Sequence, residues 1–316
     1  MKYLIAILYS TFFVYTTAIA QSDYPNKPIR AIVPFAPGGP SDLVARVTSQ
    51  KISQSIGQPI VLENEGGAGG LIGGSIVAKS KSDGYTILLS TATMVTAPVF
   101  TPDISVNQSE FEPVALIAHG YGFVLLVSPN LPVNSVAELI AYAKEHPNKL
   151  NYGDTGIGNP TQIAPQAFLD ITNIKMTGVH YKGSAPVTAD LLGGFIDLAF
   201  APTQNALPYV QSGKLKALAI TGTSRWPSLP DVPTLKEVGV NFSFINWFGT
   251  WVPAKTSPKI VQKLQKEIAN AVKDPDLKKQ FAEAGLVPVG STTEEFIRFI
   301  ESENIKMINL AKKSHQ

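Results

Sequence analysis

Apolar residues follow two spacings along this chain, and the two alternate from residue 29 onward. Short apolar runs predict strands in the first half at 29–34, 60–62, 85–90, 114–118 and 123–128. Helical spacing predicts helices between them at 43–56 and 75–81. The alternation resumes after residue 130, with helices at 136–146, 161–172 and 187–192 and strands at 150–152, 179–181, 196–199 and 217–221. This pattern predicts parallel strands joined by helical crossovers.

The last quarter of the chain has a different pattern. An extended aromatic run, NWFGTWVP, occupies 246–253, and three amphipathic helices are predicted at 258–272, 276–284 and 293–311. Ser257 before a proline predicts an N-cap, and Thr292 with Glu295 predicts a capping box. We expect these helices to pack back on the first part of the chain.

Two successive series of strand, loop and helix predict two α/β lobes. We expect each lobe to be a mixed, mostly parallel sheet flanked by helices, with a cleft between the lobes. The expected limits are 21–121 with 250–316 for lobe 1, and 122–249 for lobe 2. The expected hinges lie at 119–122 and 246–250.

The first 20 residues predict a secretory signal. Lys2 precedes an apolar stretch over 3–14, and Ala18 and Ala20 form a small-residue cleavage site, so the mature chain is expected to begin near Gln21. The alternative, an uncleaved anchor, is disfavoured because the stretch is shorter than the ~20 residues of a spanning helix. The chain has no cysteine, which excludes disulfides and a lipid anchor on an N-terminal cysteine. We expect a free periplasmic protein.

Composition and motifs exclude several function classes. The chain is 44% hydrophobic with 26 basic and 24 acidic residues and no basic run, so we expect a globular protein that binds no nucleic acid. We also expect it to be a monomer. It has no G-x-S-x-G, H-E-x-x-H or Walker A sequence, and its four histidines are isolated. The spacing of a dinucleotide fingerprint fails because Ile72 stands at the third glycine position. We therefore expect no cofactor, no metal and no catalytic set.

Glycine-rich loops are the distinctive feature that remains. The loops at 37–42, 155–161 and 182–186 each follow a strand and precede a helix. Loops at the carboxyl ends of parallel strands line ligand crevices, and helix N-termini favour anions, here a carboxylate. One such loop is more simply a tight turn, but three in two lobes favour a binding cleft. Their glycines would let a ligand approach the backbone, at Gly38, Gly39, Gly156 and Gly158.

Other candidate residues have alternative interpretations. Asp42 could stabilise the start of its helix, order its loop or meet a ligand donor. Ser90 and Thr91 offer hydroxyl groups where a strand ends, although an ordinary polar terminus explains them equally well. Trp247 fits the core better than a cleft wall. The loops contain one cation, Lys182, so we expect backbone N–H groups and water, not a buried arginine, to bind a carboxylate.

Five long segments carry a family resemblance. They are YPNKPIRAIVPFAPGGPSDLVAR, VLENEGGAGGLIGGSIVAKSKSDGYTILL, YKGSAPVTADLLGGFIDLAF, GTWVPAKTSPKIVQKLQKEI and FAEAGLVPVGSTTEEF. With them the chain resembles the Bug-type periplasmic solute receptors of tripartite tricarboxylate transporters over nearly its whole mature length. The resemblance implies a type II-like periplasmic binding protein that closes two lobes on a small organic acid and delivers it to membrane permease subunits.

The resemblance also implies site residues. The family loop P-F-x-P-G-G-x-x-D, which holds a ligand carboxylate partly through water, corresponds here to Phe35, Pro37, Gly38, Gly39 and Asp42. The second-lobe loop departs from the family, because Gln162 and Ile163 stand where a His-Leu pair is common. The remaining expected ligand-binding residues of lobe 2 are Gly156, Gly158, Asn159, Thr161, Lys182, Gly183 and Pro202.

The leading hypothesis is therefore capture of a mono- or dicarboxylate, aromatic acids included, by closure of two lobes. A sensor that docks on a signalling protein stays open as an alternative. An exported hydrolase using Asp42 or Asp154 is disfavoured, because paired carboxylates and a base–nucleophile set are missing.

Overall fold

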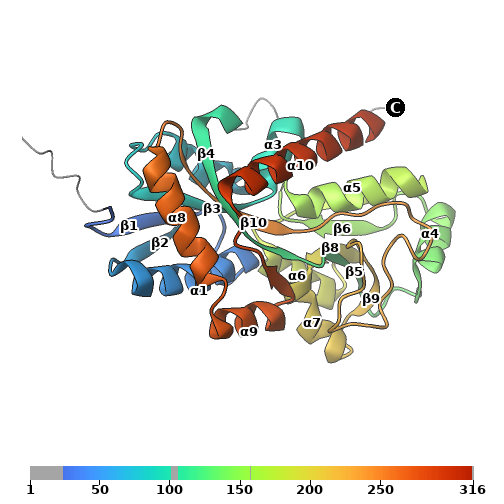
Figure 1. Ribbon diagram of the computed structural model, residues 1–316. Helices are drawn as coiled ribbons and strands as arrows, with labels where there is room; N and C mark the ends of the chain where they lie inside the picture. The colour runs from blue at the N-terminus through green and yellow to red at the C-terminus, as the bar shows by residue number, and fades with distance from the viewer. Residues whose placement is uncertain (1–23, 101–105, 157, 315–316) are drawn as a thin grey trace, which may run out of the picture.

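The computed structural model describes residues 24–100, 106–156 and 158–314, and its strands form two sheets (Figure 1). The six-stranded sheet has the order β11-β4-β10-β3-β1-β2. Its strands are β1 (Ile29–Val33), β2 (Ile60–Asn64), β3 (Thr86–Thr91), β4 (Phe111–Gly120), β10 (Trp247–Pro253) and β11 (Leu286–Pro288). The five-stranded sheet has the order β7-β6-β8-β5-β9. Its strands are β5 (Phe123–Val127), β6 (Asn151–Asp154), β7 (Thr177–His180), β8 (Leu198–Pro202) and β9 (Lys216–Ile220). The predicted signal segment lies outside the described residues.

Helices cover both faces of the six-stranded sheet because successive side chains of its strands point to opposite sides. Ile87 of β3 packs toward α1 (Pro40–Ile56), α8 (Pro258–Ala271) and α9 (Pro275–Glu283). Its neighbour Leu88 packs toward α2 (Leu71–Ala78), α3 (Thr93–Phe100) and α10 (Thr293–Ser314). Two short 3-10 turns, η1 (Ala68–Gly70) and η3 (Gln108–Glu110), precede α2 and β4.

The five-stranded sheet is covered in the same way. Leu125 of β5 packs in one cluster with residues of α4 (Val136–Glu145) and α5 (Pro160–Thr172). The adjacent Leu126 packs on the opposite side with residues of α6 (Ser184–Gly193) and α7 (Thr203–Gln211). The cluster on the α5 side also contains residues of β3 and α10, so one apolar core runs from the first sheet to the second.

The chain passes between the sheets at a tightly packed crossing. Strand β4 ends at Gly120, β5 begins at Phe123, and the chain returns to the first sheet through Asn246. The Asn246 carbonyl accepts a hydrogen bond from Gly120 N (2.8 Å), and its side-chain Oδ1 accepts one from Gly122 N (3.3 Å). Gly122 has a φ of 105°, and a Cβ there would lie 2.6 Å from Gly222 N. The lobe limits and hinges stay a prediction, but this crossing is where we expect rotation.

Strand directions depart in part from the predicted alternation. Parallel pairs join β1 to β2 and β3, and β6 to β7 and β8. Strands β10 and β5 instead run antiparallel to both of their neighbours, and β11 runs antiparallel to β4. The α/β class with mixed sheets is confirmed, although antiparallel pairing is more extensive than expected. The antiparallel pairs include the strands at which the chain crosses between the sheets, because β4 leads directly into β5 and the segment after β9 returns into β10, in both cases without a helical crossover.

Most expected elements are present near their expected positions, with a few exceptions. The sequence pattern missed α3, α7 and β11. The capping box is confirmed, since Thr292 Oγ1 accepts from Glu295 N and Glu295 Oε2 accepts from Thr292 N. Ser257 is the N-cap of α8 (Pro258–Ala271) with proline in its first turn, as expected, but its side chain makes no capping hydrogen bond.

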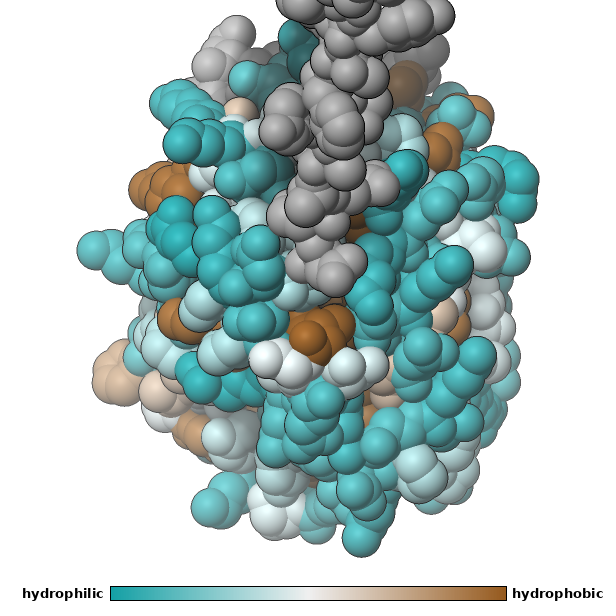
Figure 2. All heavy atoms as spheres, turned by 60° about the vertical axis from the view of Figure 1, so that its left-hand side comes forward, coloured by the Kyte–Doolittle hydropathy of each residue, from teal (hydrophilic) through white to brown (hydrophobic). Residues whose placement is uncertain are grey.

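The molecular surface in Figure 2 is mostly hydrophilic on the side that is drawn, with apolar residues dispersed among polar ones. Within the described residues, no helix has the length and apolar character needed to cross a membrane.

Candidate ligand-binding site

The loop between β1 and α1 is ordered by one buried carboxylate. Asp42 Oδ2 accepts hydrogen bonds from Gly38 N (3.0 Å) and from Arg46 Nε (2.8 Å). Asn64 Nδ2 donates both to Asp42 Oδ1 (3.1 Å) and to the Phe35 carbonyl (3.0 Å). Burial acts to raise the pKa of Asp42, but the donors from Arg46, Gly38 and Asn64 outweigh it and hold the pKa below its usual value. Of the alternatives for Asp42, the structure supports loop ordering.

This network decides which backbone groups of the first loop remain for a ligand. The N–H of Gly38 donates to Asp42 within the loop. It is therefore not free to donate to a ligand carboxylate, contrary to the expectation from the sequence. Gly39 is the N-cap of α1 and no side chain caps the helix. The first turn of this 17-residue helix therefore presents backbone N–H groups and the positive end of its dipole.

The loop between β6 and α5 is held by its own side chains. Thr161 Oγ1 lies 3.0 Å from Thr155 N and 2.7 Å from Thr155 Oγ1. Asn159 caps α5 by accepting from Thr161 N (3.1 Å), and Gln162 Oε1 accepts from Gly158 N (2.9 Å). The predicted residues Asn159 and Gln162 therefore shape the loop through these atoms.

The loop between β7 and α6 leaves its helix uncapped. The Tyr181 hydroxyl donates to Asp190 Oδ2 of α6 (2.7 Å), and desolvation, with the hydrogen bond and charge of that carboxylate, raises the pKa of Tyr181 to about 12. Lys182 is exposed. Gly183 is the N-cap of α6 and supplies no side-chain cap. Helix α7 (Thr203–Gln211) likewise has an N-cap, Pro202, that supplies no side-chain cap.

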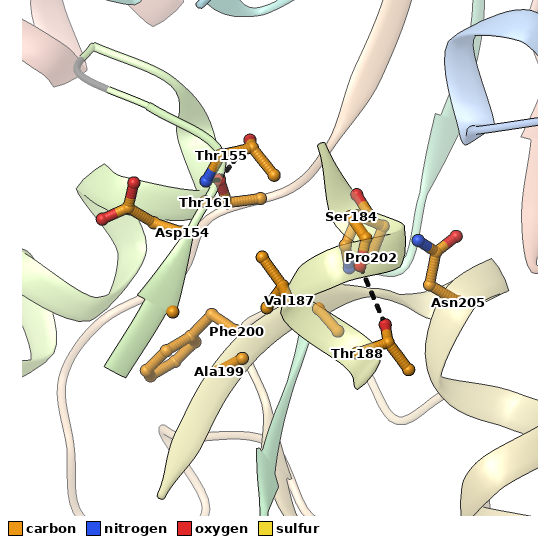
Figure 3. A pocket seen from close by; sticks show the side chains of 12 residues that line it. Asp154, Thr155, Thr161, Ser184, Val187, Thr188, Ala199, Phe200, Pro202 and Asn205 are labelled. Atoms are coloured by element: carbon orange, nitrogen blue, oxygen red, sulfur yellow. Dashed lines mark hydrogen bonds between the residues drawn. The ribbon is translucent and has the colours of Figure 1, made fainter. Parts of the chain in front are cut away.

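A small pocket of about 260 Å³, its open mouth included, lies where β6, β8, α6 and α7 meet (Figure 3). Thr155 and Thr161 lie on one side of it and Ser184 and Asn205 on the other. The full lining is Gly153, Asp154, Thr155, Thr161, Ser184, Val187, Thr188, Ala199, Phe200, Ala201, Pro202 and Asn205. Hydroxyl and amide groups dominate its polar part, and among the described lining residues there is no cation.

The predicted site residues divide into two sets. Thr161 and Pro202 line the pocket, and Gly183 directly precedes its residue Ser184. The first-loop residues do not line it. Ser90 is buried and its hydroxyl has no hydrogen-bond partner among the described residues, whereas Thr91 Oγ1 contacts Thr93 Oγ1 (3.1 Å). Of the whole predicted set, the exposed members are Pro37, Gly38 and Lys182, the partly exposed ones are Phe35, Gly39, Thr91, Gly156 and Gly183, and the buried ones are Asp42, Ser90, Gly158, Asn159, Thr161, Gln162 and Pro202.

Loops from the two halves meet beside this site. The buried Thr96 of α3 donates from Oγ1 to the Gly158 carbonyl (2.7 Å). A Cβ placed on Gly156 would lie 3.9 Å from Gly69 N, so the two glycine loops are in close proximity. The second-lobe loop therefore rests on the first half of the molecule.

Sequence reasoning missed several residues of this region. Thr155 and Ser184 stand in loops that were selected for their glycines, so their hydroxyls could have been included. Asn64, Thr96 and Asn205 had no local signal, because their partners are far away in the sequence or their helix was not predicted.

Comparison with known proteins decides the family. Residues 44–315 match the tripartite tricarboxylate transporter family receptor. The chain belongs to this family. Among solved structures, this chain is similar to the periplasmic binding protein BugD, with 33% sequence identity and a TM-score of 0.87. The match covers 92% of this chain and 99% of BugD. This chain is also similar to Rpa4515 of R. palustris with adipate (32%, TM-score 0.88, 93% and 99%) and to MatC of Rhodopseudomonas palustris with malate (28%, TM-score 0.86, 91% and 100%).

These matches bear on the predictions from sequence. The Bug-type resemblance is confirmed by the family and by BugD, and so is the binding-protein fold. The family is one of receptors and not of enzymes, so the hydrolase alternative is set aside.

Proposed function

We propose that this receptor captures a small organic acid in the periplasm by closing its two lobes and delivers it to the membrane permease of a tripartite tricarboxylate transporter. Family membership supports a solute-binding role. The similar proteins with bound adipate and malate support a small carboxylate as the solute. Residues 1–20 serve as the export signal in this proposal, and the receptor acts as a monomer.

The observation that carries the proposal is the set of uncapped helix N-termini. Helices α6 and α7 begin beside the pocket without side-chain caps, and α1 begins uncapped in the first half. Unpaired N–H groups and the positive dipole end stabilise a carboxylate without a buried cation. The Ser184 hydroxyl adds a donor for the ligand or for bridging water, whereas Thr188 Oγ1 already donates to the Ser184 carbonyl (3.0 Å) and offers only acceptor capacity.

Closure follows from binding to both halves. A ligand that contacts both loops stabilises the closed form by the difference between its affinities for the two forms. In this proposal the hydrogen bond between Thr96 and Gly158, which joins the two halves, forms on closure and adds to that stabilisation.

The test is a thermal-shift screen of the mature protein with adipate, malate, monocarboxylates, aromatic acids and amino acids, and with neutral sugars as the control. At a ligand concentration 100 times the Kd, binding adds about 2.7 kcal/mol to the unfolding free energy, which gives a clear rise in Tm. Isothermal titration then gives the Kd of each acid that raises the Tm. A rise with sugars and with none of the acids would refute the carboxylate assignment. Delivery is tested separately, by acid uptake into vesicles containing the permease with and without the receptor.

A further inference from the structure

A buried charge lies beneath the second-lobe loop and is not explained by helix capping. The Asp154 side chain, at the end of β6, is 0% exposed, whereas its neighbour His180, at the end of β7, has a side chain that is 48% exposed. The two residues are register partners on parallel strands. His180 Nδ1 lies 2.8 Å from Asp154 Oδ1 and 3.0 Å from Oδ2. Because an ionised carboxylate only accepts hydrogen bonds, we assign a proton to Nδ1.

The same carboxylate holds the start of the ligand loop. Asp154 Oδ1 also accepts a hydrogen bond from Gly156 N (2.8 Å), where the backbone has a φ of 114°. The Gly156 carbonyl accepts from Asn159 N (3.2 Å), and the Gly158 carbonyl accepts from Thr96 of α3. A connected path therefore leads from the half-exposed imidazole, through the buried carboxylate and the loop, to the other half of the molecule.

We propose that His180 is a positioning residue for the described part of the ligand loop, residues 155–156 and 158–161. Its imidazole donates a hydrogen bond to Asp154 and orients the carboxylate toward Gly156 N, and this fixes the loop in the form that contacts α3. A buried carboxylate that loses its charged or donating partner is strongly destabilised where it lies. Without the imidazole, Asp154 turns into the space that His180 vacates and toward solvent, and it releases Gly156. The proposal rests on the proposed function insofar as this loop forms one side of the acid site.

Three variants test the proposal. His180→Ala removes the imidazole. His180→Asn restores a donor at the Nδ1 position, because Asn Nδ2 is bonded to Cγ as Nδ1 is. His146→Ala is the matched control, because His146 Nδ1 also contacts an oxygen, the Tyr142 carbonyl (3.0 Å), but lies at the end of α4.

The first readout is hydrogen exchange of the ligand-free mature protein, followed by mass spectrometry on a peptide covering 153–163. We expect roughly 10- to 100-fold faster exchange in His180→Ala, from the worth of a hydrogen bond to a charged group. Wild-type rates are expected in His180→Asn and His146→Ala, with similar thermal midpoints in all three variants. Unchanged exchange in His180→Ala, or equally fast exchange in His180→Asn, would overturn the positioning role.

The second readout is the Kd for adipate, with malate as a second probe. We expect His180→Ala to weaken binding by about 10-fold or more and His180→Asn to restore it. If the wild type binds a probe and His180→Ala binds it with the same Kd, the positioning role is refuted and the proposed function is not affected. If wild type binds neither these probes nor any acid of the screen, the proposed function fails, and the exchange measurement still decides the role of His180.

Discussion

The buried hydrogen bond between Thr96 and Gly158 joins the two halves of the receptor and can be removed with little change in shape. Thr96 is 1% exposed, and its Oγ1 lies 2.7 Å from the Gly158 carbonyl. Thr96→Val replaces the hydroxyl with a methyl group of similar size. In the closed form this leaves a buried carbonyl without its donor, whereas water can reach the carbonyl when the halves separate.

The expected magnitude follows from that difference. Leaving a buried polar group unsatisfied costs about 1–3 kcal/mol. Because the cost falls on the closed form, the ratio of closed to open receptor should decrease by roughly 5- to 150-fold. The affinity for adipate should fall by up to the same factor. The full factor is expected if most of the ligand-free protein is in the open form.

Small-angle X-ray scattering of the free protein measures opening as a larger radius of gyration, and isothermal titration measures the Kd. Thr48→Val is the matched control, since Thr48 in α1 is also buried but its Oγ1 has no partner among the described residues. Removing that hydroxyl should leave the unfolding free energy unchanged or raise it, without opening the molecule. Equal scattering and equal Kd in Thr96→Val and Thr48→Val would refute the reasoning.

Two further predictions concern the first loop. Asp42→Asn should lower the unfolding free energy at pH 7 by about 2 kcal/mol, because charge-assisted bonds are lost. The folded pKa of Asp42 is depressed, so its stabilisation is present above the unfolded value of about 3.9 and is lost as pH falls through the folded pKa. Urea unfolding should thus show the variant approaching wild type below that range, and an equal deficit at every pH would contradict this assignment. Gly39→Val should weaken acid binding while the circular dichroism spectrum is unchanged, because the nearest atom to a Cβ there is Ala36 O at 3.7 Å. Unchanged affinity would remove this loop from the site.

Local features of the sequence were sufficient for most of the helices and strands. The period of apolar residues located α1, α4, α5 and the three C-terminal helices, because that period depends on which face of each element is buried. The capping box joins Thr292 to Glu295, which is only three residues away in the sequence, and it is present as expected. Helix α3 was missed because its sequence, TMVTAPVF, contains β-branched residues and Pro98, so its helical form depends on packing against α10 and α2.

The candidate site was predictable only in part. Glycine spacing and strand ends indicated the loops, and the family resemblance selected among their residues. The distribution of hydrogen bonds within them was not predictable, since the donor from Asn64 to Asp42 spans 22 residues, and that from Thr96 to Gly158 spans 62. These partners meet because of strand order, which no local pattern specifies.

The sequence by itself therefore determined the α/β class, the glycine loops at strand ends and the absence of a recognisable catalytic set, because each depends on residue type or on neighbours within a few positions. The tertiary structure alone decided that Asp42 orders its loop, that the second-lobe loop rests on α3, and that His180 meets Asp154. The bonds of Asn64 to Asp42, of Thr96 to Gly158 and of His180 to Asp154 each require two segments to be brought side by side by the fold. Burial then makes the contacts matter, because a charge or carbonyl removed from water must find its partner within the protein.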